Sequence, residues 1–156
     1  MFLDSYMYWI DYCKGSAHIE RARLDGTKRT TLISRGIQFP TGLALDESAG
    51  KLYWAGINAD KKGIIEAISL NGLHRTVKFH EKFYKPFNLD VFGDHVYWSD
   101  EKKNEVLRIN KFNGYGEEVI MRGLVKPQGL KIRREKIYGR IIYYFMKTFT
   151  SFYLLF

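Results

Sequence analysis

Two polar loops carry the residues of this chain best suited to chemistry, and their composition favours binding over catalysis. The richer loop reads His80-Glu81-Lys82-Phe83-Tyr84-Lys85. The second loop contains Asn58 and Asp60. Aromatic rings beside charged groups are typical of the residues that dominate protein interfaces. We therefore predict a partner-binding surface at these loops. In the alternative interpretation, Phe83 or Tyr84 packs beneath its loop and the charges are only solvated.

Catalytic and metal-binding motifs are missing from the sequence, which contains no HExxH, GxSxG, paired-cysteine or phosphate-loop pattern. A calcium-dependent hydrolase would need several oxygen ligands that converge at the centre of the fold. Asn88 and Asp90 are the residues of the expected inner strands that could supply them, and Lys131 would oppose a cation. We predict a protein that is not an enzyme and uses no cofactor.

The elements that position these loops are repeated along the chain. Tyr-Trp pairs recur at steps of 45 and 44 residues, as Tyr8-Trp9, Tyr53-Trp54 and Tyr97-Trp98. A repeat of this length is typical of one four-stranded blade of a β-propeller. Adjacent residues of a strand point to opposite faces of a sheet, so each pair can fill the gaps on both sides of its blade. We interpret these aromatic residues as structural.

Turn signals divide each repeat into short strands. Asp25-Gly26, Asn71-Gly72 and Asn113-Gly114 each lie between two strand-like runs and predict tight hairpins. Prolines at 40, 86 and 127 precede the expected inner strands, because a proline cannot donate to a sheet ladder. The pattern predicts an all-β fold with about three four-stranded antiparallel blades, near residues 1–36, 37–82 and 83–125, and a fourth that starts at 127.

The first and third aromatic motifs resemble a known repeat. Tyr8-Trp9-Ile10-Asp11 and Tyr97-Trp98-Ser99-Asp100 are similar to the YWTD repeat of the low-density lipoprotein receptor family. The resemblance covers residues 6–132, although Tyr53-Trp54-Ala55-Gly56 lacks the aspartate. We expect Asp11 and Asp100 to accept local hydrogen bonds at their strand ends.

The resemblance implies a six-bladed propeller, of which residues 1–132 would form part. It implies a non-catalytic module for protein binding or ligand release in an endocytic or signalling receptor, on the extracellular side of the membrane. The expected partners are a protein ligand or neighbouring receptor modules. A secreted matrix protein and a calcium-dependent propeller hydrolase are the alternatives. An open half-ring exposes blade faces, so we expect a fragment that is unstable or self-associating alone.

The tail over 133–156 departs from the repeat. Its Tyr138-Gly139 would keep the tyrosine of a fourth aromatic pair and lose the tryptophan. Arg140 and Lys147 oppose a membrane-spanning helix over the apolar end. Much of the net charge of +8 lies in residues 131–156, so the repeat region predicts no nucleic-acid partner. The sequence shows no signal-peptide pattern, and its single cysteine is Cys13.

Overall fold

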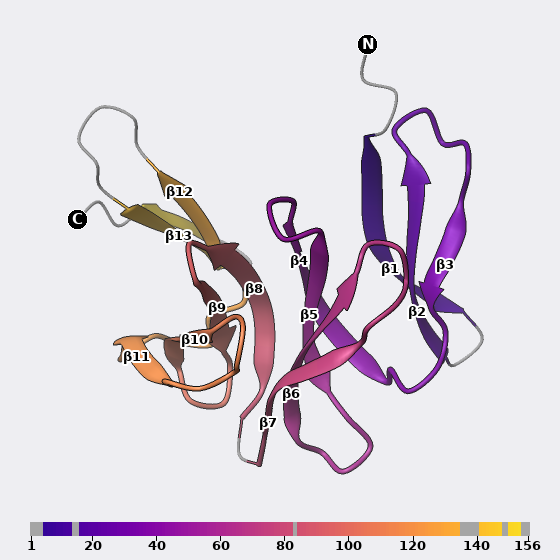
Figure 1. Ribbon diagram of the computed structural model, residues 1–156. Coiled ribbons are helices and arrows are strands. Elements are labelled where there is room, and N and C mark those ends of the chain that lie inside the picture. Colours follow the sequence, from indigo (N-terminus) through magenta and orange to yellow (C-terminus); the bar gives the residue numbers. More distant parts are fainter. Residues whose placement is uncertain (1–4, 14–15, 83, 135–140, 148–149, 154–156) are drawn as a thin grey trace.

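The computed structural model describes residues 5–13, 16–82, 84–134, 141–147 and 150–153. These residues form antiparallel sheets that follow one another along an arc (Figure 1). The sheet nearest the N-terminus lies at one end of the arc, and the sheet nearest the C-terminus lies at the other. The predicted all-β, partial propeller is confirmed.

The first blade has three described strands in the order β1-β2-β3, which are β1 (Tyr6–Cys13), β2 (Ser16–Arg23) and β3 (Thr30–Ile33). The second blade has four, which are β4 (Phe39–Asp46), β5 (Lys51–Ile57), β6 (Gly63–Ser69) and β7 (Thr76–Glu81). The third blade also has four, which are β8 (Pro86–Phe92), β9 (His95–Asp100), β10 (Glu105–Asn110) and β11 (Glu118–Met121). The four predicted strands are present in the second and third repeats, and three are described in the first.

The last sheet combines β12 (Lys131–Arg134), β13 (Ile141–Lys147) and β14 (Thr150–Tyr153). The predicted fourth aromatic slot at Tyr138-Gly139 falls outside the described residues. Among the described residues, no helix is long and apolar enough to cross a membrane.

The inner strands of the second and third blades each have a proline and a local irregularity near their start. The pairing register shifts between Pro40 and Gly42 in β4, and between Pro86 and Asn88 in β8. We expected Pro40 to precede the inner strand, but it is the second residue of β4. The bulge allows this, because it removes the need for the missing N–H of Pro40 in the ladder.

The aromatic pairs fill the gaps between blades. Tyr53 belongs to the core that the second blade shares with the third, whereas Trp54 belongs to the core that it shares with the first. Trp98 and Tyr97 repeat this division, since Trp98 faces the second blade and Tyr97 packs with Leu130 of the segment that leads into β12. The prediction that each pair packs both faces of its blade is confirmed for these two pairs.

Gly56 explains why the second motif lacks an aspartate. A Cβ atom at this position would lie 2.4 Å from the carbonyl oxygen of Phe39 and 2.9 Å from Cα of Pro40. The backbone of β4 therefore occupies the space that a side chain at residue 56 would need.

Arg75 joins the first two blades through a compact polar contact. Its guanidinium lies over the ring of Trp54 at 5.1 Å from the centroid and contacts Glu66 Oε2 at 2.6 Å. It also donates to the carbonyl oxygens of Arg35 and Gly36, at 2.8 and 2.6 Å. These carbonyls belong to the turn by which the chain leaves the first blade, so Arg75 attaches one blade to the exit turn of the blade before it.

Candidate protein-binding rim

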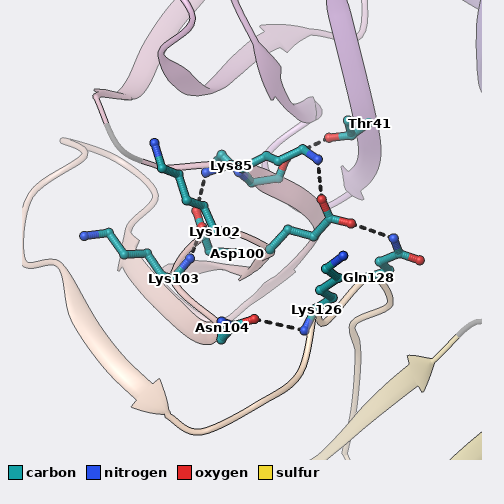
Figure 2. Close-up of polar contacts among 10 residues, drawn as sticks. Thr41, Lys85, Asp100, Lys102, Lys103, Asn104, Lys126 and Gln128 are labelled. Atoms are coloured by element: carbon teal, nitrogen blue, oxygen red, sulfur yellow. Dashed lines mark hydrogen bonds and ion pairs between the residues drawn. The ribbon is translucent and has the colours of Figure 1, made fainter.

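Asp100 orders two neighbouring loops at the rim of the third blade. The residue ends β9 and is fully buried. Its carboxylate accepts hydrogen bonds from the backbone N–H groups of Lys85 at 2.9 Å, Lys102 at 3.0 Å and Lys103 at 2.9 Å (Figure 2). The predicted role of Asp100 as a local acceptor is confirmed. The same contacts fix the backbone from which three lysine side chains extend.

Asp11 behaves differently from Asp100. Its carboxylate pairs with the guanidinium of Arg29 at 3.2 Å, in a partly exposed position. Residues 14 and 15, which follow its strand, lie outside the described residues, so the local role of Asp11 stays a prediction.

Glu101 connects this rim to the segment that follows the third blade. Its carboxylate pairs with Lys85 and accepts a hydrogen bond from Gln128 at 2.6 Å. Burial acts to raise the pKa of Glu101, but the hydrogen bonds from Gln128 and Lys85 and the charges of Lys85 and Lys126 outweigh it, so the pKa is lowered. Asn104 Oδ1 accepts from the backbone N–H of Lys126 at 3.0 Å. Three chain segments are thereby held together.

The result is a basic surface that we call the lysine rim, formed by Lys85, Lys102, Lys103 and Lys126 (Figure 2). All four residues are exposed. Lys85 is paired with Glu101, and Lys103 Nζ lies 4.5 Å from the ring centroid of Tyr84. These four lysines outnumber the carboxylates of Asp100 and Glu101 that contact them or their backbone, so the lysine rim carries net positive charge. Sequence reasoning identified Lys85 and missed the other three.

Tyr84 is packed under its loop. Its ring meets the ring of Phe79 edge-to-face at 5.0 Å, and its hydroxyl donates to Glu117 Oε1 at 2.8 Å. Burial, followed by the hydrogen bond and negative charge of Glu117, raises the pKa of Tyr84 to about 12. Tyr84 therefore supports Lys103 from beneath, as in the alternative interpretation of this loop. Phe83 lies outside the described residues.

The structure brings the two predicted loops together at Asn58 and His80. Asn58 Nδ2 lies 2.9 Å from Nε2 of His80. Asn58 Oδ1 accepts from the backbone N–H groups of Asp60 and Lys62, at 3.1 and 3.0 Å, so the amide nitrogen must face the histidine. Asn58 Nδ2 can then donate to Nε2 of His80. The side chains of His80, Glu81, Lys82 and Asp60 are exposed.

Asp90 and Asp46, at the inner strands, are used for structural contacts. Asp90 is buried and accepts from the backbone N–H of Ile132 at 2.8 Å, and Lys131 Nζ lies 3.1 Å from its Oδ2. Asp46 Oδ2 accepts from Lys111 Nζ at 2.7 Å, and both side chains are buried. Across the described part of the chain, no three His, Cys, Asp or Glu side chains gather to hold a metal ion.

Comparison with known proteins agrees with this architecture. Residues 5–47 match the family model described as low-density lipoprotein receptor repeat class B. Low-density lipoprotein receptor-related protein 5 of mouse (Mus musculus) is 38% identical over 109 residues, which cover 70% of this chain and 7% of the receptor. The human (Homo sapiens) low-density lipoprotein receptor-related protein 5-like protein is 34% identical over 133 residues, which cover 85% of this chain and 51% of that protein.

Among solved structures, a chain of the crystal structure of the nidogen/laminin complex aligns with a TM-score of 0.74 and 27% identity. The alignment covers 90% of this chain and 50% of that one. This chain thus spans 7% and 51% of the two curated relatives. The motifs, the sheet order and these likenesses place the chain in the low-density lipoprotein receptor class B (YWTD) repeat family, whose repeats fold here as neighbouring blades of a β-propeller.

Proposed function

We propose that this chain is a non-catalytic protein-binding module of a receptor, exposed on the extracellular side of the membrane, and that the lysine rim contacts an acidic segment of its ligand. The observation that carries the proposal is the fixed set of lysines at Lys85, Lys102, Lys103 and Lys126. Loops at the rim of a rigid scaffold are where such folds hold binding residues. A matched arrangement of charge speeds association and selects the partner.

The predicted residues at the neighbouring loops extend this surface. His80, Glu81 and Lys82 are exposed at the end of β7 and beyond it, and Asn58 with Asp60 lies beside them. We place them at the edge of the interface, with the ligand crossing from the second blade to the third. Similarity to low-density lipoprotein receptor-related protein 5 supports the receptor context.

The non-catalytic role is supported by the chemistry of Asp90. A carboxylate that accepts a backbone N–H and pairs with a lysine has little capacity left for a calcium ion. A second candidate function is that of a propeller in a secreted matrix protein, favoured by the likeness to the nidogen/laminin structure.

Charge reversal tests the proposed interface. The probe is a fluorescein-labelled peptide of alternating glutamate and serine, whose binding to the whole chain is followed by fluorescence anisotropy. We expect Lys103→Glu to weaken binding about tenfold, since it replaces an attraction with a repulsion at the surface. Lys28→Glu makes the same charge change at the hairpin on the opposite rim and is expected to leave binding unchanged.

Added salt should weaken binding of the wild-type chain, because exposed charges are screened. Equal effects of Lys103→Glu and Lys28→Glu, or no binding of the peptide, would overturn the proposed interface.

A further inference from the structure

The first blade contains an arginine, Arg29, with the same ring and carboxylate contacts as Arg75. The guanidinium of Arg29 lies over Trp9 at 5.4 Å from the ring centroid and contacts Glu20 Oε2 at 2.6 Å, as Arg75 does with Trp54 and Glu66. Among the described residues, however, no backbone carbonyl accepts from Arg29. The side chain of Arg29 is 59% exposed, compared with 31% for Arg75. Arg29 therefore makes the ring and carboxylate contacts that Arg75 makes, but in the described structure it has no counterpart of the two carbonyl oxygens that Arg75 contacts.

The turn by which the chain leaves the third blade resembles the turn at Arg35 and Gly36, whose carbonyl oxygens accept from Arg75. Arg122-Gly123 matches Arg35-Gly36 in sequence, and the two glycines have similar positive φ values of 73° and 65°. A Cβ atom added at Gly36 would meet the guanidinium of Arg75 at 3.2 Å. One added at Gly123 would meet nothing within 4 Å. The turn that an arginine covers after the first blade is thus open after the third.

The edge of β1 and the segment that forms β12 also match a pair of strands that lie side by side in the second blade. β1 corresponds to β5, because both carry the aromatic pair, yet β5 pairs with the inner strand β4 while β1 is an edge of its described sheet. The segment that enters β12 repeats the pattern of β4, as Gly129-Leu130-Lys131-Ile132 matches Gly42-Leu43-Ala44-Leu45. Leu130 and Ile132 pack on the third blade as Leu43 and Leu45 pack on the first.

We propose that two copies of this chain join end to end, with β1–β3 of one copy seated on the third blade of the other. β1 would pair with the partner's β12 as β5 pairs with β4, and Arg29 would donate to the partner's Arg122 and Gly123 carbonyls. Each copy offers one such face and one such turn, so two identical contacts close a ring of two copies.

This arrangement has a cost and a gain within each copy. β12 pairs with β13 in the single chain, so β13 and β14 leave this position when the partner's first blade takes it. Trp9 is half-buried in the single chain, whereas Trp54 at the equivalent place is fully buried. Burial of Trp9 and closure of a four-stranded blade favour the joined state, because large aromatic side chains contribute strongly to interfaces.

Sedimentation of the whole chain over a range of concentrations tests the proposal. We expect a monomer that converts into a species of twice its mass. Arg29→Ala should weaken this association at least about tenfold, because charge-assisted hydrogen bonds to the carbonyls are lost. Lys61→Ala removes one exposed positive charge from the loop between β5 and β6, outside the proposed contact, and should leave association unchanged.

Hydrogen exchange measured by mass spectrometry supplies the second readout. As concentration rises, amide protection should increase in β1 and β12 and decrease in β13 and β14. A chain that stays monomeric, larger assemblies that grow without limit, or a dimer with equal protection of β1 at all concentrations would each overturn the proposal. This readout remains decisive if Arg29→Ala fails to fold, because it uses the wild-type chain.

Discussion

Lys111 and Asp46 form a buried ion pair across two blades, with Lys111 Nζ 2.7 Å from Asp46 Oδ2 and only 7% and 5% of the two side chains exposed. Asp46 ends the inner strand β4, and Lys111 follows β10 of the next blade. Asp46 also accepts hydrogen bonds from Ser48 Oγ and the Ala49 N–H. The pair therefore fixes the position of the third blade against the inner strand of the second.

Removal of one partner should be more harmful than removal of both. Lys111→Met leaves Asp46 as a buried charge without its counter-ion, and we expect the free energy of unfolding to fall by about 3–5 kcal/mol. The double variant Lys111→Met with Asp46→Leu should regain most of this loss, because apolar residues of similar volume tolerate burial. Equilibrium unfolding in urea measures both. A double variant as unstable as the single one would contradict this account.

The same pair makes stability depend on pH. Burial acts to raise the pKa of Asp46, but hydrogen bonds from Lys111, Ser48 and Ala49 and the charge of Lys111 outweigh it, so the folded-state pKa is lowered from its ordinary value. This contribution is therefore present above the unfolded-state value and is lost as pH falls through the folded-state pKa. Wild type should lose more stability than Asp46→Asn between about pH 5 and pH 2. Parallel curves for the two chains would show that Asp46 does not contribute.

Arg75 should stabilise the joint between the first two blades. Arg75→Ala removes hydrogen bonds to two carbonyls and to Glu66, so we expect a loss of about 2–3 kcal/mol in the free energy of unfolding. Arg122→Ala serves as the control, because Arg122 is 75% exposed and its pair with Glu105 should contribute about 1 kcal/mol or less. Similar losses for the two variants in thermal or urea unfolding would refute a special role for Arg75.

Restoring the missing aspartate of the second motif should destabilise the protein. Gly56→Asp recreates the pattern of the other two motifs but places a Cβ atom 2.4 Å from the carbonyl oxygen of Phe39. The backbone of β4 would have to move, which we expect to cost about 1–3 kcal/mol. The melting temperature measured by circular dichroism provides the test. A higher melting temperature for Gly56→Asp would show that the backbone of β4 moves aside at little cost.

The sequence was sufficient for the parts of the fold that rest on local pattern. The Tyr-Trp spacing, the Asp-Gly and Asn-Gly hairpins and the role of Asp100 depend on residues near one another in the chain. The contact between Asp46 and Lys111 joins residues 65 positions apart, and no local pattern predicts it. The lysine rim was only partly predicted for the same reason, since Lys103 and Lys126 become neighbours when separate loops converge.

Tyr84 shows a second limit of local pattern. Its exposed or packed state depends on Phe79 beneath it and on Glu117 in the third blade, and neither contact is visible in the loop composition. The structure of the tail over 133–156 could not be predicted, because its sequence departs from the repeat on which the other predictions rest.

The opposed packing of Tyr53 and Trp54 constrains how this protein can change in length. An insertion of one residue inside β5 would reverse the phase of the strand and send the tryptophan into the gap now filled by the tyrosine. Two adjoining cores would then be filled with the wrong volumes at once. Gains and losses of single residues should therefore be tolerated in the rim loops and rejected within the strands, so binding surfaces can diversify while the blades keep their spacing.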